Sequence, residues 1–429
     1  MARNMKDSGI EWIGEIPEGW RTINPKALFT QRKDKAQKGE RQLTSSQQYG
    51  ILYQDDYMEL TGSKVVTVEK DFDILKHVEA GDFVISMRSF QGGLEYSTNS
   101  GAISSAYVML VPNLELVYPR FYRWLLKSSV YIDALQRTTN MVRDGQAMRY
   151  SNFAQVRLFT LPLDEQKSRA DFLDLECSSI DKILFKTRSS IEEYKKLKQV
   201  VITQAVTKGV RGEREMKDSG VEWIGKIPTT YSICKLKYLL KNPLKYGANE
   251  SGIPYSDSLP RYIRITDITP DGNLKYTGKL SLSEESAKDY ILEDGDILFA
   301  RSGATVGKTF IYYQSYGRSA YAGYLIKASL NNKVSPKFVY YYTCSSLYEI
   351  WKNSIFIQST IQNIGADRYA NLPVPVPKTL QEQEEIADYL DAKCTEIDKL
   401  IAKKEQLVKE LESYKKSLIY EVVTGKREV

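Results

Sequence analysis

The sequence predicts an α+β protein built from two tandem mixed α/β domains that two long helices separate and join. The helices are expected to pair as an antiparallel intramolecular coiled coil, which makes the chain pseudo-twofold. Three features predict this organisation: an internal repeat, two long stretches without proline or glycine, and strand-like runs between them. The predicted boundaries are 1–160 for the first α/β domain, 161–213 for the first helix, 214–376 for the second domain and 377–429 for the second helix.

The internal repeat is the strongest signal. Met5–Pro17 reads MKDSGIEWIGEIP and returns at Met216–Pro228 as MKDSGVEWIGKIP, identical at eleven of thirteen positions. Later anchors stay in step, whereas residues 30–80 and 240–290, and 85–104 and 300–318, align poorly. One unit was therefore duplicated, its framework kept and its variable parts changed. The matched anchors are Gly81–Ile85 with Gly295–Phe299, Ser105–Tyr107 with Ser319–Tyr321, Pro119–Phe121 with Pro336–Phe338, and Leu173–Asp174 with Leu390–Asp391.

The long helices are predicted over residues 164–207 and 379–424, about 42 residues or about 60 Å each at 1.5 Å per residue. Asp164 is the expected N-cap of the first, and Thr379 with Glu382 spells a capping box for the second. Apolar residues recur at steps of three and four, which predicts a coiled-coil seam. The economical partner of each helix is the other one, although packing of each helix on its own domain is the alternative. The predicted seam residues are Leu173, Ile180, Leu184, Tyr194 and Leu197 in the first helix and Leu390, Ile397, Ile401, Leu411 and Tyr414 in the second.

The intervening residues, about 15–160 and 226–375, are interpreted as mixed α/β domains with largely antiparallel sheets. Each also carries one mid-length helix with proline in its first turn, at Pro119 and Pro336. The predicted strands are Val65–Val68, Phe83–Met87, Tyr107–Val111, Tyr262–Ile265, Ile297–Ala300 and Thr309–Tyr313.

Composition narrows the class of protein. The net charge of +6 is compatible with nucleic acid binding but does not require it. No apolar run is long enough to span a membrane, and the polar N-terminus is not a signal peptide. The four separated cysteines (Cys177, Cys234, Cys344 and Cys394) fit a reducing, cytoplasmic setting and argue against a zinc site. The single histidine, His77, weakens many enzyme interpretations.

The segment most similar to a catalytic motif is Ser302–Thr309, SGATVGKT, which is close to a phosphate-binding loop. A phosphate-binding loop needs Gly-x4-Gly-Lys-Ser/Thr before a helix, whereas Ser302 stands at the first glycine position and a strand-like run follows. We interpret the segment as a turn between strands with a polar loop. Glu193-Tyr-Lys195 has nuclease-like spacing but lies on the long helix as a solvated charge run. We therefore expect no catalytic residues and no metal site in this chain.

The repeated Lys-Asp-Ser-Gly-x-Glu-Trp-Ile-Gly-x-Ile-Pro opening resembles the specificity subunits of type I restriction–modification systems. Leu372-Pro-x-Pro-x-Pro377, with Gln381 to Ala387 and Tyr389-Leu-Asp391 after it, is similar to the same family, as are Arg301–Lys308 and Ser359–Asn363. The resemblance covers nearly the whole chain. One departure is Leu161–Gln166, which is shorter than its second copy and lacks the repeated prolines.

The resemblance implies a non-catalytic subunit of a DNA adenine methyltransferase and ATP-dependent endonuclease that serves host defence. Two target recognition domains would read the halves of a bipartite, asymmetric sequence in double-stranded DNA, with the helices as a spacer. Two modification (methyltransferase) subunits would dock on the chain, and restriction (translocase and endonuclease) subunits would join. The chain itself would hold no cofactor, while S-adenosylmethionine, ATP and Mg²⁺ are expected on the partner subunits.

A residue that reads sequence must differ between two domains that read different half-sites. The candidate DNA-binding residues are therefore polar residues of the divergent segments: Arg88, Gln91, Arg143, Gln146, Arg149, Tyr150, Arg301, Lys308, Arg318, Gln358, Thr360 and Gln362. The shared segments fit structure or partner docking better, and the candidate docking residues are Trp12, Ile13, Trp223 and Ile224.

Two other hypotheses stay open at this point. The first is an autonomous ATP-dependent or nuclease enzyme, which would rest on the Gly307-Lys308-Thr309 segment. The second is a coiled-coil assembly scaffold that never contacts bases.

Overall fold

The computed structural model describes residues 3–68, 72–86, 94–138, 149–269, 272–303, 305–357 and 363–429. By its internal contacts the chain divides into two units. Unit 1 comprises residues 1–188 and 406–429, and unit 2 comprises residues 189–405. Each unit therefore combines an α/β region with part of each long helix, α6 (Leu163–Lys208) and α11 (Leu380–Val423).

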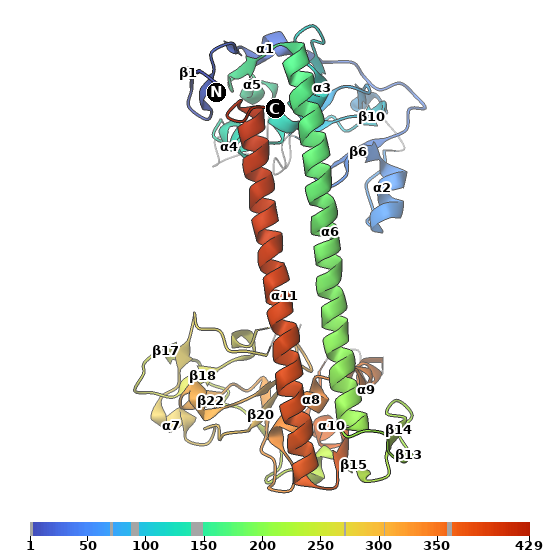
Figure 1. Ribbon diagram of the computed structural model, residues 1–429, viewed down its shortest axis with the longest axis vertical. Helices are drawn as coiled ribbons and strands as arrows, with labels where there is room; N and C mark the ends of the chain where they lie inside the picture. Colours follow the sequence, from blue (N-terminus) through green and yellow to red (C-terminus); the bar gives the residue numbers. More distant parts are fainter. Residues whose placement is uncertain are drawn as a thin grey trace. The chain divides into compact units, whose positions relative to one another are not determined.

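The α/β region of unit 1 precedes α6 in the chain (Figure 1). Its strands are β1 (Met5–Ile10), β2 (Gly14–Pro17), β3 (Arg21–Ile23), β4 (Phe29–Arg32), β5 (Leu43–Ser46), β6 (Gly50–Tyr53), β7 (Lys76–Val78), β8 (Phe83–Ser86), β9 (Glu95–Tyr96), β10 (Gly101–Ile103), β11 (Tyr107–Pro112) and β12 (Leu158–Thr160). Its helices are α1 (Pro25–Leu28), α2 (Gln54–Thr61), η1 (Phe72–Ile74), α3 (Pro119–Leu126), α4 (Ser129–Gln136) and α5 (Tyr150–Phe153).

The α/β region of unit 2 lies between the two long helices in the chain. Its strands are β13 (Met216–Asp218), β14 (Lys226–Pro228), β15 (Tyr231–Lys235), β16 (Lys245–Tyr246), β17 (Ile253–Pro254), β18 (Arg261–Ile263), β19 (Leu280–Ser281), β20 (Ile297–Ala300), β21 (Thr309–Ile311), β22 (Ser319–Tyr321), β23 (Leu325–Ala328) and β24 (Pro373–Pro377). Its helices are η2 (Leu236–Tyr238), η3 (Ile265–Asp267), α7 (Glu284–Ala287), η4 (Gln314–Tyr316), α8 (Pro336–Thr343), α9 (Ser346–Ile357) and α10 (Ala366–Ala370).

The duplication predicted from the sequence is visible in the sheets. Each unit holds a four-stranded antiparallel sheet, in the order β4-β11-β8-β9 in unit 1 and β16-β23-β20-β21 in unit 2. The Gly-Asp turns at Gly81 and Gly295 lead into the buried strands β8 and β20. The smaller sheets differ, because unit 1 has the pairs β5-β6 and β10-β7 whereas unit 2 has β17-β19-β18-β22 with a parallel β18-β22 pair. The framework is thus repeated and the additions to it are not.

The same helix-to-helix contact fastens both α/β regions to a long helix. In unit 1 the Asp174 carboxylate of α6 accepts hydrogen bonds from Arg120 and Trp124 of α3. In unit 2 the Asp391 carboxylate of α11 accepts from Lys337 and Tyr341 of α8. The side chains differ in type, but the aspartate and the positions of its donors are preserved.

Buried glutamines anchor the first turn of each long helix. The Gln166 side chain accepts from the Tyr118 N–H at 2.7 Å and donates to the Leu161 carbonyl at 2.8 Å. Gln383 accepts from the Ser335 N–H at 2.7 Å and donates to a carbonyl in the segment that precedes its helix. Both glutamines are at most 1% exposed, so their bonds replace those that water would make.

The two helices run antiparallel within each unit, as the sequence predicts (Figure 1, green and red). In unit 2 the Lys198 ammonium bonds both Asp398 oxygens, at 2.8 and 2.6 Å. In unit 1 the corresponding Lys415 bonds both Asp181 oxygens, at 2.6 and 2.7 Å. The repeat therefore extends to the ion pairs that bridge the helices.

Leu173, Ile180, Leu184, Leu390 and Ile397 are buried on the predicted seam, and Tyr194, Ile401 and Leu411 are partly buried. The seam cysteines Cys177 and Cys394 are buried too, and this burial raises the pKa of each thiol to about 11. Those cysteines therefore act as small apolar groups.

Two of the predicted seam residues differ from expectation. Leu197 and Tyr414 are 46% and 47% exposed. A step of four residues, which strict alternation requires after Tyr194 and Leu411, leads instead to Lys198 and Lys415. These two lysines bridge the helices. Each lysine stem lies along the seam while its ammonium reaches an aspartate of the other helix.

Unit 1 is closed by a buried arginine that joins the start of α6 to the end of α11. Arg169 is 2% exposed and donates to the carbonyls of Val422 and Arg427, both at 2.9 Å. It also pairs with Glu165, which accepts from Arg3 and from the Trp20 indole. Burial raises the pKa of Glu165, but these hydrogen bonds outweigh it and lower the pKa to about 2. In unit 2, Glu382 accepts from Arg214 and Tyr231 in the corresponding place.

Three local expectations need correction. Val65–Val68 is not a strand; the Gln42 side-chain amide instead pairs with both the N–H and the carbonyl of Val68, at 2.9 and 2.8 Å. Asp164 lies inside the first turn of α6 rather than at its N-cap. Thr379 does accept the Glu382 N–H at 3.3 Å, but the Glu382 carboxylate is engaged by Arg214, so the capping box is half formed.

We expect Arg169→Met to lower the free energy of unfolding by about 3–5 kcal/mol, because it removes one partner of a buried ion pair and leaves two carbonyls without their donor. Urea unfolding of the full chain, followed by tryptophan fluorescence and circular dichroism, measures the change. The control is Arg188→Met, which removes the exposed Arg188–Glu412 pair between the same helices and should cost less than about 1 kcal/mol. Equal losses in the two variants would contradict this account of the closure.

Candidate nucleic-acid interface

A patch of two tyrosines and two cations lies at one end of the four-stranded sheet of unit 2. Tyr246 ends β16, Tyr324 precedes β23, and Arg301 and Lys308 stand at the two ends of the β20–β21 connection. The register of the sheet brings these residues together. Tyr246 of β16 and Phe299 of β20 both pair with Ile326 of β23. Ala300, which precedes Arg301, pairs with Leu325, which follows Tyr324. We call these four residues the sheet-end patch.

Contacts within the sheet-end patch hold Arg301 in place. Its N–H donates to the Tyr324 carbonyl at 3.0 Å, and its guanidinium carbon lies 5.0 Å from the centre of the Tyr246 ring. The Tyr246 hydroxyl accepts the Ala366 N–H at 3.0 Å, which ties the ring to α10. Among the described residues no carboxylate pairs with Arg301, and its Nε is buried without a hydrogen-bond partner. A fixed, uncompensated guanidinium suits recognition of phosphate or of a guanine edge.

The Arg301–Lys308 segment connects two antiparallel strands, as the sequence analysis predicted, and β21 follows it directly. Its base is rigid because the Tyr348 hydroxyl of α9 donates to the Gly307 carbonyl at 2.7 Å. Gly307 has a φ of 81°, which favours glycine, and a Cβ there would lie 2.2 Å from the Lys352 side chain, which would have to move. Lys308 is exposed at the end of this segment.

Other predicted DNA-binding residues have roles within the fold. Arg318 forms a bidentate pair with Glu284 at 2.6 and 2.7 Å, which balances its charge. The Tyr150 hydroxyl donates to the Phe29 carbonyl, whereas Arg149 is exposed at the start of α5. The remaining candidates lie outside the described residues: Arg88, Gln91, Arg143, Gln146, Gln358, Thr360 and Gln362.

Sequence reasoning missed Tyr246 and Tyr324, which are 41% and 61% exposed, because nothing distinguishes them among thirty tyrosines before the sheet register is known. The predicted DNA-binding residues also do not include three lysines that follow β4 in unit 1. Lys33, Lys35 and Lys38 are exposed, and no ion pair engages them within the described part of the chain. The signal in the sequence is their close spacing, which makes a short basic run. Such free ammonium groups are suited to phosphate.

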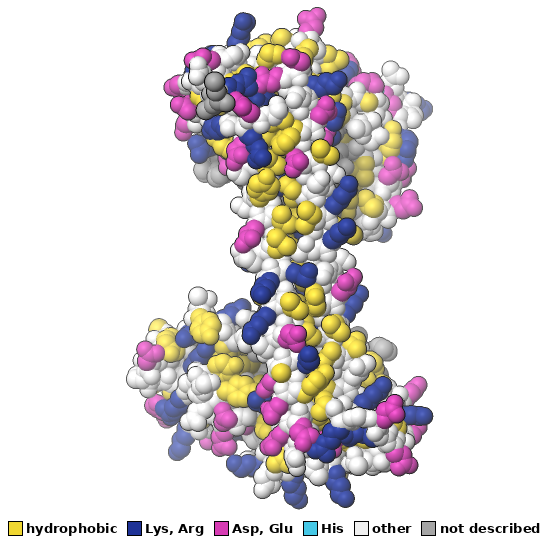
Figure 2. All heavy atoms as spheres, in the orientation of Figure 1, with side chains coloured by type: hydrophobic (Ala, Val, Ile, Leu, Met, Phe, Trp, Pro, Cys, Tyr) yellow, Lys and Arg dark blue, Asp and Glu magenta, His cyan; other side chains and the backbone are white. Residues whose placement is uncertain are grey.

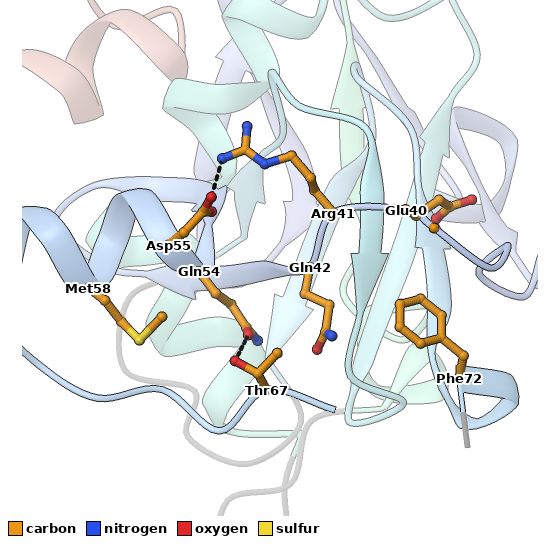
Figure 3. A pocket seen from close by; sticks show the side chains of 9 residues that line it. Glu40, Arg41, Gln42, Gln54, Asp55, Met58, Thr67 and Phe72 are labelled. Carbon is orange, nitrogen blue, oxygen red and sulfur yellow. Dashed lines mark hydrogen bonds and ion pairs between the residues drawn. The ribbon is translucent and has the colours of Figure 1, made fainter. Parts of the chain in front are cut away.

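A hollow of about 350 Å³ in unit 1 is lined by residues 39–42, which follow that basic run in the sequence, and by residues from 54 to 72 (Figure 3). Arg41 at its edge pairs with Asp55 at 2.7 Å and Asp56 at 3.0 Å, and its guanidinium stacks on Tyr53. Gln54 accepts from the Thr67 hydroxyl at 3.0 Å, so two glutamines, Gln42 and Gln54, fasten the 66–68 segment. These contacts satisfy the lining groups internally and make the hollow a structural part of the divergent region.

The only histidine of the sequence is bound on both sides. His77 Nδ1 lies 3.1 Å from both Glu40 carboxylate oxygens, and Nε2 lies 3.0 Å from Glu79. Burial lowers the pKa of His77, but its hydrogen bonds to the two glutamates raise it by more, so the net pKa is above its ordinary value. His77 therefore acts as a link between β7 and the 37–40 turn.

The predicted docking residues lie in the two repeated hairpins. Ile13 and Ile224 are 2% and 7% exposed and belong to the main core of their units. Trp12 packs edge-on against Tyr131 and donates to the Arg157 carbonyl at 3.2 Å. Trp223 is half-buried, and its Nε1 is buried without a partner. Docking at these segments stays a prediction.

No group of three or more histidine, cysteine, aspartate or glutamate residues in the described ranges is arranged to hold a metal ion. Among the same residues, no helix is both long and apolar enough to cross a membrane.

Comparison with known proteins gives two kinds of match. The family described as the type I restriction modification DNA specificity domain matches residues 254–412. The fold matches a chain solved in work on complex assembly and conformational transition of the type I R-M system, with a TM-score of 0.71, 14% identity, and coverage of 96% of this chain and 99% of that one. It also matches the HsdS subunit from Thermoanaerobacter tengcongensis, with a TM-score of 0.51, 14% identity, and coverage of 96% and 98%. At this identity the structural matches establish the fold.

Proposed function

We propose that this chain is a member of the type I restriction–modification specificity family, which matches residues 254–412, and that it reads a bipartite, asymmetric DNA sequence and scaffolds the subunits that act on it. Each unit reads one half of the target. The chain contributes recognition and assembly, and no catalytic step.

The observation that carries this proposal is the contrast between what the two units share and what they do not. The anchors at Asp174 and Asp391, and the bridges from Lys415 and Lys198, are the same in both units. The surfaces around the four-stranded sheets are different: unit 2 offers the sheet-end patch, and unit 1 offers the lysines after β4. One framework with two surfaces is what two unequal half-sites require.

The direct readout in unit 2 is assigned to Arg301. A guanidinium fixed on a tyrosine ring has little conformational entropy to lose and can bond the O6 and N7 atoms of one guanine. Lys308 and the hydroxyls of Tyr246 and Tyr324 would hold phosphate and set the register.

The long helices are proposed as the element that sets the gap between the half-sites. α6 has 46 residues and α11 has 44. At 1.5 Å per residue each is close to 70 Å long, roughly the length of twenty base pairs.

Partner subunits would bind exposed apolar surface on these helices, part of which is seen in Figure 2. In unit 1, Phe185 is 75% exposed and borders a hollow of about 550 Å³ that Trp124 and Cys177 also line. Exposed apolar surface of this kind is typical of protein interfaces. We propose modification subunits carrying S-adenosylmethionine, and restriction subunits using ATP and Mg²⁺, as the partners in the cytoplasm. The solved type I R-M assembly with the same fold supports this part of the proposal.

Methylome sequencing tests the function directly. In a host that expresses the chain with its modification subunits, we expect methylated adenines in one interrupted sequence whose two halves differ. A continuous target, a palindrome, or methyl transfer by the purified chain alone would contradict the proposal.

Arg301→Ala should relax or abolish recognition at one half-site and leave the other intact. The discrimination lost corresponds to about 1–3 kcal/mol, or about 5- to 150-fold in Kd between matched and mismatched duplexes. Fluorescence anisotropy with duplexes altered in either half measures it. Arg318→Ala is the matched control, because Glu284 already balances Arg318 and the substitution should leave the DNA preference unchanged.

Shortening both helices should change the gap and keep both half-sites. Residues 189–195 and 401–407 face each other by the register of the Lys198–Asp398 and Lys415–Asp181 pairs, so removing both preserves those bridges. Seven residues correspond to about 10 Å, or about three base pairs. The methylome of the variant gives the new gap. Replacing the same residues with an equal number of helix-forming residues should leave the gap as it was.

A further inference from the structure

The repeated hairpins, β1–β2 and β13–β14, are more alike than any other parts of the two units. The structure accounts for most of this identity. Lys6 donates to the Glu18 carbonyl at 2.5 Å, and Lys217 donates to the Thr229 carbonyl at 3.0 Å. Each lysine closes its own hairpin, so both are needed for local structure.

The turn residues are explained in the same way. Asp7 and Asp218 accept the N–H of the glycine two residues on, at 2.9 and 2.8 Å. Those glycines, Gly9 and Gly220, have φ values of 64° and 74°, which favour glycine. The remaining explained identities are a serine that caps the turn (Ser8, Ser219) and isoleucines of the core (Ile13, Ile16, Ile224, Ile227).

One exposed side chain that is identical in both hairpins has no such explanation. Glu11 and Glu222 lie next to the half-buried tryptophans, and both are exposed. Glu11 contacts Arg137 at 3.3 Å, but its side chain is 91% exposed and that of Arg137 is 72% exposed, so the pair is weak. The residue 217 positions beyond Arg137 is Ser354, so the second unit keeps the glutamate without this arginine. No hydrogen bond or ion pair engages the Glu222 side chain among the described residues.

The neighbouring exposed position shows that the hairpin surface tolerates a change of charge. Glu15 in the first hairpin is Lys226 in the second, only four residues beyond the kept glutamate. The constraint is therefore local to the Glu-Trp step. The shared side chain is also negatively charged, and a carboxylate is repelled by the phosphates of DNA. An exposed carboxylate beside an aromatic ring instead suits a lysine or arginine presented by a protein.

We propose that Glu11 with Trp12, and Glu222 with Trp223, form two equivalent docking points for a partner protein that presents a basic side chain. The partner binds once per unit, and the modification subunit is the protein that occupies both points. This inference rests on the proposed function, because it names where that subunit contacts each hairpin.

The test compares Glu11→Arg, Glu222→Arg and the double variant, each mixed with purified cognate modification subunit. Native mass spectrometry should show two modification subunits on the wild-type chain, one on each single variant and none on the double variant at concentrations that saturate wild type. Each reversed site should weaken binding at least tenfold. Glu15→Lys is the matched control, since the second hairpin already has lysine there, and it should bind two subunits as wild type does.

Two further measurements keep the outcomes distinct. The thermal midpoint and the affinity of the chain alone for its target duplex should not change in any variant, because Glu11 and Glu222 are exposed and lie in the repeated hairpins, outside the divergent segments that hold the candidate reading residues. Normal stoichiometry and affinity in the double variant, or equal loss in Glu15→Lys, would overturn the inference while target binding upholds the proposed function. A wild-type chain that binds neither its target nor the modification subunit would overturn both.

Discussion

The pairing of Arg169 with the end of α11 is the constraint on which unit 1 depends. Its guanidinium is almost fully buried, so every donor must find an acceptor, and two of the acceptors are carbonyls more than 250 positions away in the chain. Unit 1 is complete only when residues near both ends of the chain have met. In unit 2, Arg214 and Tyr231 donate hydrogen bonds to Glu382 of α11 in a similar way. Each α/β region is therefore bound to a long helix that follows it in the chain.

This closure explains why some features are repeated and others are free to change. The buried glutamines, the aspartates that receive α3 and α8, and the lysine bridges all lie on or beside the two helices. A change in either glutamine would leave buried polar groups without their partners, and a change in an aspartate or lysine would remove the hydrogen bonds that connect the helices. Residues at the edges of the four-stranded sheets are not constrained in this way. Variation there alters which groups face a ligand while the unit stays folded.

The sheet-end patch and the lysines after β4 illustrate two ways of presenting positive charge. Arg301 is fixed by stacking on Tyr246 and by the hydrogen bond of its backbone, whereas the exposed side chains of Lys33, Lys35 and Lys38 form no ion pair among the described residues. A fixed guanidinium can discriminate between bases, while mobile ammonium groups contribute affinity without a sequence preference. The Arg318–Glu284 pair shows the opposite case, in which a cation in a divergent segment is used by the fold.

The sequence by itself determined the duplication, the two long helices and their antiparallel pairing, because identity at a constant offset and regular apolar spacing are local properties of the chain. It placed the β20–β21 connection correctly as a turn, since a glycine-rich segment before a strand cannot present amides from a helix. Only the tertiary structure decided that Lys198 and Lys415, rather than Leu197 and Tyr414, face the other helix, since a one-residue difference in phase depends on the partner's position. It also decided which of the many tyrosines and arginines are free, because exposure and pairing depend on residues far away in the sequence, as Glu284 does for Arg318 and Tyr246 for Arg301.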